Sequence, residues 1–198
     1  MNDIFYSLQG EGRNTGRAAV FIRFAGCNLR CPFCDTEFDT YTEMTDEDIV
    51  KQVSSLIPHR PSLIVLTGGE PTLQVDEAFV DLLHQHGFEV AMESNGTRPA
   101  PRNLDWLTVS PKENGDARVR WYEGTRIPDE IKVVFTGSQS VPPLPLEGAG
   151  ERLLLYLQPC DTGDVRRNAE ITSACVEYIK SHPEWRLSLQ THKLIGID

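Results

Sequence analysis

Three of the five cysteines lie in one short loop, at Cys27, Cys31 and Cys34, with the spacing C-x3-C-x2-C. A [4Fe–4S] cluster is held by Cys thiolates and normally takes four of them. Three thiolates from one loop can hold three irons, and no fourth Cys or His lies nearby in the sequence. The spacing therefore predicts a [4Fe–4S] cluster whose fourth iron is open to an exchangeable ligand.

Two other uses of these cysteines compete with the cluster. Structural zinc prefers four ligands, usually with a second Cys or His pair further along the chain, and Cys160 and Cys175 form no such pair. A disulfide framework belongs to secreted chains, whereas Met1 is followed by no charged and apolar leader. We therefore favour the cluster, and we expect Cys175, which shares a helical face with apolar residues, to be a buried thiol.

Size and charge narrow the class of protein. The chain has 198 residues, enough for one domain (1–198) with a real core, and its net charge of −10 argues against binding to nucleic acid or to an anionic membrane. No apolar run approaches the roughly 18 residues that span a bilayer. Reduced cysteines and an oxygen-sensitive cluster would suit the cytoplasm.

The elements that must position the cysteines alternate along the chain. Apolar runs predict strands at 18–24, 62–66, 88–92, 106–109, 131–135, 153–157 and 186–189, and helical spacing predicts helices after Thr45, over 75–86 and over 168–180. Such alternation indicates a parallel α/β fold. About six core strands are too few for a closed eight-stranded barrel. We divide the domain into an N-terminal hairpin (1–24), a cluster loop (25–40) and a C-terminal tail (186–198).

Polar and glycine-rich motifs follow four of the predicted strands, at 67–71, 93–97, 110–112 and 158–161. In α/β folds, binding sites lie at the carboxyl ends of parallel strands. These four motifs and the cysteine loop are therefore expected to meet at one mouth of the sheet.

The cysteine loop and the motif Gly68-Gly69-Glu70-Pro71 resemble those of the radical S-adenosylmethionine enzymes. Within that superfamily the segments 8–12 (LQGEG), 34–36 (CDT) and 190–193 (QTHK) resemble those of the 7-carboxy-7-deazaguanine synthases of queuosine biosynthesis. The resemblance runs from Ile4 to the C-terminus. It implies a reduced radical SAM core, a partial (βα)6-like open barrel of mostly parallel strands, and a homodimer.

The resemblance also implies a carbon–nitrogen lyase that depends on the cluster, S-adenosylmethionine and Mg²⁺. The open iron would bind S-adenosylmethionine, and an electron from a flavodoxin- or ferredoxin-type reductant would cleave it to a 5′-deoxyadenosyl radical. That radical would abstract hydrogen from 6-carboxy-5,6,7,8-tetrahydropterin, whose ring would contract to 7-carboxy-7-deazaguanine with loss of ammonia. No side chain has a certain catalytic role, because the cofactor carries the chemistry.

By the same resemblance, the residues expected to bind the cofactor are Gly69, Glu70, Ser110, Lys112, Gln158, Pro159, Cys160 and Asp161. Three of them have simpler alternatives. Glu70 could accept from the cofactor's amino group or only cap a loop, and Lys112 could be a surface lysine. Cys160 lies far along the chain and is interpreted as a packing thiol, not as a fourth cluster ligand.

The residues expected to bind the substrate are Leu8, Gln9, Gly10, Glu11, Arg23, Thr67, His192 and Asp198. The planar fork of Arg23 suits the pterin carboxylate, although an ordinary ion pair with a neighbouring acid is the alternative. Glu11 could meet the amidine-like N–H edge of the pterin, as could Gln9 or Gly10 through the backbone. The resemblance makes Thr36 the protein's Mg²⁺ ligand, and it places His192 in a tail that closes the substrate site.

Two other functions compete with this one. An activase that installs a glycyl radical must admit a loop of its partner protein, whereas Glu11, Arg23, Thr36 and His192 indicate a closed polar pocket for a small anion. A zinc-stabilised binding module would have no chemistry, and it would lack the brown colour of an iron–sulfur protein.

Overall fold

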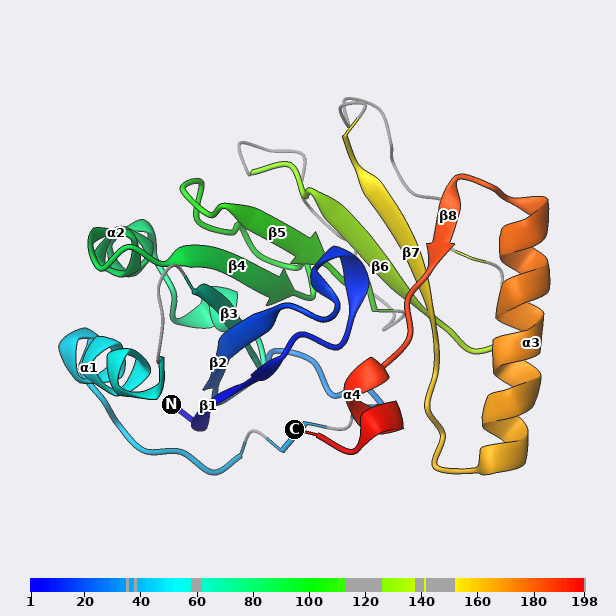
Figure 1. The fold of residues 1–198 in the computed structure, drawn as a ribbon, viewed down its shortest axis with the longest axis horizontal. Coiled ribbons are helices and arrows are strands. Elements are labelled where there is room, and N and C mark those ends of the chain that lie inside the picture. The colour runs from blue at the N-terminus through cyan, green and yellow to red at the C-terminus, as the bar shows by residue number, and fades with distance from the viewer. Residues whose placement is uncertain are drawn as a thin grey trace.

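One eight-stranded sheet organises the molecule, and its strands follow one another in chain order from β1 to β8. The computed structural model describes residues 1–34, 36–37, 39–57, 62–112, 126–137, 141 and 152–197. β1 is antiparallel to β2, and every later pair is parallel. Among the described residues, β1 pairs only with β2 and β8 only with β7, so the sheet is an open, partial barrel (Figure 1).

The strands are β1 (Asp3–Leu8), β2 (Ala18–Phe24), β3 (Leu63–Gly68), β4 (Glu89–Ser94), β5 (Trp106–Val109), β6 (Glu130–Phe135), β7 (Leu154–Pro159) and β8 (Trp185–Leu187). The α-helices are α1 (Asp46–Leu56), α2 (Glu77–Gln85), α3 (Val165–Ser181) and α4 (Thr191–Ile195), and two short 3₁₀ turns are η1 (Gly12–Asn14) and η2 (Pro71–Leu73). None of the helices in the described part of the chain is long and apolar enough to cross a membrane.

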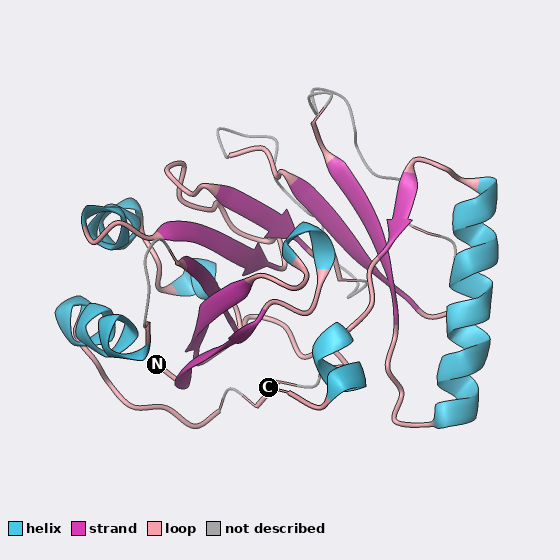
Figure 2. Ribbon diagram, in the orientation of Figure 1, coloured by secondary structure: helices cyan, strands magenta, loops and turns pink. Residues whose placement is uncertain are grey.

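The two faces of the sheet have different chemistry, because successive strand residues point to opposite sides. On β6, Ile131, Val133 and Phe135 are buried in the main apolar core. Lys132 and Val134, which alternate with them, line a cavity on the opposite face. Helices α1, α2 and α3 lie outside the sheet and cover the core face, whereas α4 lies beside the hairpin turn (Figure 2).

Local signals set the helix ends. The Thr45 hydroxyl accepts from the backbone N–H of Asp48 at 3.2 Å and begins α1. Asp76 caps α2 in the same way through the N–H of Phe79, and Gly87 follows that helix with a φ of +78°. α3 begins three residues earlier than the predicted 168, because Asp164 accepts from the N–H of Arg167.

The hairpin and the C-terminal tail meet across the open edge of the sheet. The N–H of Gly12 donates to Ser188 Oγ at 3.0 Å, and the N–H and hydroxyl of Thr191 donate to the carbonyl of Gly10 at 3.0 and 2.9 Å. Side chains and backbone thus bridge a gap that no strand pairing fills in the described chain.

The predicted fold class is confirmed, with two differences in detail. The sheet has eight strands, more than the six or so expected in its core, because the edge strands β1 and β8 join it. The last strand begins and ends slightly earlier than 186–189, and the tail after it forms the short helix α4.

Candidate active site

A cavity of about 660 Å³ opens at the carboxyl ends of the parallel strands. A volume of this size suits a cofactor or a drug-sized ligand. Of the residues that the sequence singled out as site residues, those that line the cavity are Leu8, Gln9, Gly10, Glu11, Arg23, Cys27, Cys31, Cys34, Thr36, Thr67, Gly69, Ser110, Lys112, Gln158, Pro159, Cys160, Asp161 and His192. Glu70 is not among them, and Asp198 lies outside the described residues.

The cysteine loop rests directly on the glycine motif after β3. The N–H of Gly69 donates to the carbonyl of Phe24, and the N–H of Glu70 donates to the carbonyl of Gly26, both at 2.9 Å. A Cβ on Gly69 would lie 1.8 Å from the Gly26 oxygen, so a side chain cannot fit there. The glycine motif is therefore required for the close approach of two loops, which aims the cysteine loop into the cavity.

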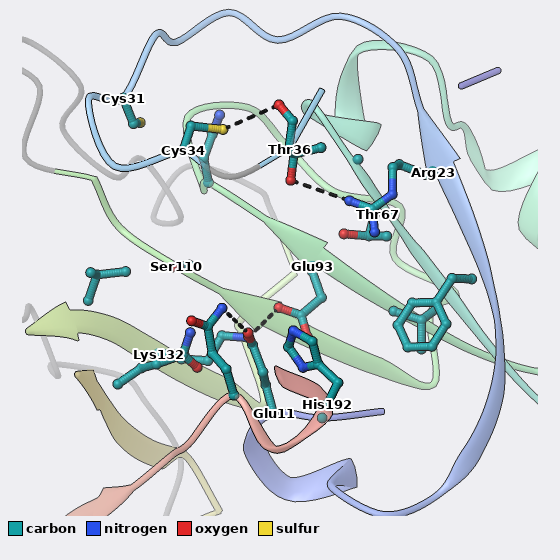
Figure 3. A pocket seen from close by; sticks show the side chains of 18 of the residues that line it. Glu11, Arg23, Cys31, Cys34, Thr36, Thr67, Glu93, Ser110, Lys132 and His192 are labelled. Atoms are coloured by element: carbon teal, nitrogen blue, oxygen red, sulfur yellow. Dashed lines mark hydrogen bonds and ion pairs between the residues drawn. The ribbon is translucent and has the colours of Figure 1, made fainter. Parts of the chain in front are cut away.

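All three loop cysteines line this cavity, and Cys31 and Cys34 lie at one end of it in Figure 3. Burial raises the pKa of the Cys27 thiol, although the N–H of Leu29 donates to its sulfur at 3.4 Å. No three Cys, His, Asp or Glu side chains of the described residues come close enough to hold a single metal ion. Three cysteines on one cavity are one fewer than the four that a [4Fe–4S] cluster normally takes.

Glu70 is fully buried, and its carboxylate faces the protein interior. One oxygen accepts from the N–H and hydroxyl of Thr72 at 3.0 and 2.7 Å and from the Ser94 hydroxyl at 2.9 Å. The other accepts from the N–H of Asn95 at 2.7 Å. The side chain therefore caps η2 and ties the loop after β3 to the end of β4, which favours the loop-capping alternative.

Lys132 forms the centre of a charged cluster at the other end of the cavity (Figure 3). Its ammonium lies 2.5 Å from Glu11 Oε2 and 2.7 Å from Glu93 Oε2, and its side chain is only 4% exposed. Gln190 Nε2 donates to the second oxygen of Glu11 at 3.0 Å, and Gln9 Nε2 donates to the second oxygen of Glu93 at 3.1 Å. The cluster joins the hairpin, β4, β6 and the tail.

The charges of this cluster shift its pKa values. Burial alone would raise the pKa of Glu11, but the charge and hydrogen bond of Lys132 outweigh it and hold that pKa well below its usual range. Burial opposes the charge of Lys132, yet Glu11 and Glu93 raise its pKa. Nearby Glu130, whose Oε2 accepts from the N–H of Arg13 at 3.0 Å, has its pKa raised to about 7 by burial and by the charge of Glu93.

Arg23 lines the cavity beside Thr36, away from the Lys132 cluster (Figure 3). Its Nη1 donates to Thr36 Oγ1 at 3.3 Å, and its guanidinium lies 5.5 Å from the centre of the Phe5 ring. Among the described residues no carboxylate pairs with Arg23, so the ion pair considered as its alternative role is absent there.

Lys112 is not the surface lysine of its alternative role. Its ammonium donates to Ser110 Oγ at 2.8 Å and lies 5.7 Å from the centre of the Phe33 ring. Burial lowers its pKa, and the charge of Lys132 lowers it further. Lys112, which follows β5, and Lys132, which lies within β6, therefore both line this cavity.

The segment after β7 contacts both the cavity and the tail. Asp161 accepts from Lys193 Nζ at 3.0 Å and from Asn168 Nδ2 at 2.7 Å. Hydrogen bonds from the N–H of Gly163, from Lys193 and from Asn168 lower the pKa of Asp161 to about 2, and the bond from Gly163 contributes most. Cys160 is buried beside it, and its thiol donates to the Asp161 carbonyl at 3.7 Å.

Comparison with known proteins shows the family to which the chain belongs. A model of the radical SAM superfamily matches residues 21–113, from within β2 to just beyond Lys112. The 7-carboxy-7-deazaguanine synthase of Bacteroides thetaiotaomicron is 47% identical over 197 residues, which cover 100% of this chain and 97% of that relative. The chain belongs to the 7-carboxy-7-deazaguanine synthase family.

Other comparisons agree with this assignment. The 7-carboxy-7-deazaguanine synthase of Bradyrhizobium diazoefficiens is 42% identical over 220 residues, covering 100% of this chain and 98% of that one. The crystal structure of QueE from Escherichia coli superposes with a TM-score of 0.69 at 26% identity, over 96% of this chain and 92% of that chain. As a radical SAM member of the synthase family, the chain uses a [4Fe–4S] cluster and S-adenosylmethionine.

Several residues at this cavity have no role that the sequence alone predicts. In the sequence Glu93 belongs to a strand-end motif and Lys132 to an apolar run, and neither pattern gives the residue a role. The signal for Lys132 is a charged residue inside a run whose neighbours are apolar, because a lysine in a buried strand requires partners. Gln190 carried no such signal, because its partner Glu11 lies 179 residues away in the sequence.

Proposed function

We propose that this chain converts 6-carboxy-5,6,7,8-tetrahydropterin to 7-carboxy-7-deazaguanine with release of ammonia. Two observations together support this proposal most strongly. The chain matches the synthases along its whole length, and the three loop cysteines, Arg23 and Glu11 line a single cavity. The substrate proposed here has a carboxylate and a hydrogen-bond-donating ring edge, and the cavity offers complementary groups for both.

We assign the cluster to Cys27, Cys31 and Cys34, which are the loop thiols on the cavity. When bound, the cluster supplies the electron that cleaves S-adenosylmethionine and so generates the 5′-deoxyadenosyl radical. Gly69, Ser110, Lys112 and the segment 158–161 surround the space next to the loop, and we assign them to the cofactor. Glu70 acts in this proposal by fixing the loop after β3, since its carboxylate is already fully hydrogen-bonded.

We assign the pterin carboxylate to Arg23 and the pterin N–H edge to Glu11. Arg23 donates to Thr36 but pairs with no carboxylate among the described residues, and its planar fork matches a carboxylate in geometry and charge. Glu11 is held ionised by Lys132, so it can only accept hydrogen bonds. Leu8, Gln9, Gly10, Thr67 and His192 line the space between or beside these two residues, and Asp198 is kept as a proposed contact from the tail.

The proposal includes a Mg²⁺ ion bound by Thr36 Oγ1. Mg²⁺ keeps several waters and is usually held by few protein oxygens together with substrate oxygens. Thr36 contacts Arg23 at 3.3 Å, so an ion bound there would lie close to a carboxylate held by that arginine. The substrate would then supply the oxygens that one hydroxyl cannot.

Further parts of the proposal concern the setting of the reaction. We propose a flavodoxin- or ferredoxin-type reductant, a homodimer, and a single domain over 1–198, by analogy with the family. A reducing compartment such as the cytoplasm suits a cluster that oxygen destroys.

The test is a single reaction. Anaerobic, reconstituted protein is incubated with the carboxytetrahydropterin, S-adenosylmethionine, Mg²⁺ and a reductant, and the product is identified by mass. We expect the deazaguanine and one ammonia per turnover. Cleavage of S-adenosylmethionine without any deazaguanine would contradict the substrate while leaving the radical SAM chemistry intact.

A further inference from the structure

Lys132 lies behind two carboxylates that open on the cavity. The side chains of Glu11 and Glu93 keep 17% and 22% of their surface exposed, whereas the side chain of Lys132 keeps only 4%. The cation is therefore screened from a ligand by its own partners. The ligand would meet the carboxylates, and the lysine would act through them.

Each carboxylate has acceptor capacity left after its protein contacts. A carboxylate has about four lone-pair sites on its two oxygens. Glu11 accepts one hydrogen bond from Lys132 and one from Gln190. Glu93 accepts one from Lys132 and one from Gln9. The remaining acceptor sites suit N–H donors of a ligand in the cavity.

We propose that Lys132 is a positioning residue of the substrate site, which holds the Glu11 and Glu93 carboxylates in place by contacting both, so that they accept hydrogen bonds from the donor edge of the substrate. The inference rests on the proposed function for the identity of that substrate. It adds Lys132 to the substrate site and gives a physical reason for its presence: two carboxylates so close together in a buried site repel each other unless a cation lies between them.

The other titratable groups around Glu11 do not replace this cation. His192 lies on the tail side of Glu11, and its charge acts on Glu11 more weakly than that of Lys132. Lys112 faces the same cavity from the end of β5 and donates to Ser110. Glu130, two residues before Lys132, adds a further acid beside Glu93 and makes the need for a cation greater.

A purely structural role is the competing explanation, because removing one partner of a buried ion pair destabilises a protein by about 3–5 kcal/mol. The two roles differ in what they do to pH dependence. Lys132→Met keeps the length of the side chain and removes its charge, so burial should push the pKa of Glu11 upward. Substrate binding should then strengthen as the pH rises and Glu11 ionises.

The kinetic experiment measures the pterin KM of wild type and Lys132→Met between pH 6.5 and 8.5. We expect the mutant KM at pH 6.5 to exceed that of wild type by more than about tenfold, and the ratio to fall as the pH rises, since each pH unit below a pKa changes the ionised fraction about tenfold. S-adenosylmethionine cleavage without pterin should persist. Lys132→Arg, which keeps the charge, should lie between the two proteins.

The matched control removes the groups that titrate. Glu11→Gln combined with Glu93→Gln should raise the pterin KM at every pH, and Lys132→Met in that background should add no pH dependence, since both carboxylates that contact Lys132 are then absent. A KM ratio that stays flat with pH in Lys132→Met, or an equal loss of pterin turnover and S-adenosylmethionine cleavage, would overturn the proposal.

A direct measurement separates this inference from the proposed reaction. In protein labelled with ¹³C at the glutamate carboxyl, the Glu11 signal is the one lost in Glu11→Gln. We expect no titration of it between pH 5 and 9 in wild type, and titration within that interval in Lys132→Met. If this result appears while wild type makes no deazaguanine, the reaction is wrongly assigned; if the Glu11 signal does not move in the mutant, Lys132 does not hold it ionised.

A second variant covers the case in which Lys132→Met does not fold. Lys132→Met combined with Glu93→Gln carries one unpaired buried carboxylate where Lys132→Met carries two, so its cost to folding is smaller. The same sign of pH dependence in its pterin KM and in its Glu11 carboxyl signal supports the proposal, and a flat response of both contradicts it.

Discussion

Gly10 and His192 lie so close together that a Cβ on Gly10 would be 2.1 Å from Nδ1 of His192. The two residues belong to the hairpin and to the tail, at opposite ends of the chain. Their approach is fixed by the carbonyl of Gly10, which accepts twice from Thr191. The absence of a side chain at position 10 is thus what lets the histidine ring reach the cavity wall.

Gly10→Ala should therefore displace His192 and weaken substrate binding. Because a misplacement of about 1 Å at a site can cost on the order of 100-fold, we expect a rise in the pterin KM of roughly 10- to 100-fold. S-adenosylmethionine cleavage without substrate should be unchanged. In a His192→Ala background, Gly10→Ala should cost less, because only the backbone N of residue 192, 3.0 Å from the added Cβ, still has to shift. An additional loss as large as in wild type would show that the methyl group does not act through the histidine ring.

Replacing Cys27, Cys31 or Cys34 by Ala should remove the iron and abolish S-adenosylmethionine cleavage, because the loop has only enough thiolates for a cluster with one open iron. Iron content and absorbance near ~400 nm measure the result.

The two remaining cysteines supply the controls. Cys160→Ser and Cys175→Ser should keep the iron, although the second should be less stable by about 1–3 kcal/mol, since it buries a hydroxyl in the apolar core. Loss of the cluster in Cys160→Ser would disprove the open-iron arrangement.

Thr36→Ala should raise the Mg²⁺ concentration needed for half-maximal turnover without lowering the iron content, because it removes one oxygen ligand and no thiol. Mg²⁺ titrations of turnover compare the variant with wild type. Thr36→Ser, which keeps the hydroxyl, should titrate like wild type. Superimposable curves for Thr36→Ala and wild type would rule out the hydroxyl as a ligand.

Glu70→Gln should destabilise the protein although it preserves shape. Whichever way the amide is turned, its NH₂ group meets a backbone or hydroxyl donor where the carboxylate oxygen now accepts. Leaving buried donors unsatisfied costs about 1–3 kcal/mol each. Urea unfolding of the two proteins measures the difference, and equal midpoints would contradict the capping role.

Glu130 makes stability depend on pH near neutrality. Burial and the charge of Glu93 raise its pKa from the ordinary 4.5 to about 7 in the folded protein, so the folded state holds this proton more tightly than the unfolded state does. The resulting stabilisation is complete below about pH 4.5 and is lost as the pH rises through 7.

Glu130→Gln removes that titration. From pH 5 to pH 8 the unfolding free energy of wild type should fall relative to that of the variant, by roughly 2 kcal/mol. Gln retains an oxygen that can accept from the N–H of Arg13. Parallel stability–pH curves for the two proteins would show that Glu130 titrates normally.

The architecture was predictable because its rules are local. Apolar runs gave the strands, Thr45 gave a helix start, and the position of site residues at the carboxyl ends of parallel strands brought 67–71, 93–97, 110–112 and 158–161 to one cavity. The three cysteines lie in one short loop, so their joint position on the cavity also follows from local spacing.

The polar interior was not predictable, because it depends on partners that are far apart in the chain. Lys132 stands in an apolar strand, and only the inward alternation of β6 together with the position of the hairpin brings it to Glu11, 121 residues away. Glu70 belonged to a motif that suggested a ligand contact, but its hydrogen bonds to Thr72 and Ser94 turn it into the protein.

The strand order bears on how the molecule is made. Each strand pairs with the one synthesised just before it, so the sheet can grow on the ribosome one strand at a time. The cysteine loop emerges early, after β2, whereas Ser188 and Thr191 emerge after all eight strands. Gly10 and Gly12 are therefore synthesised near the start of translation, whereas their hydrogen-bond partners are synthesised near its end. A nascent chain presents its cysteines in a cavity that still lacks one wall.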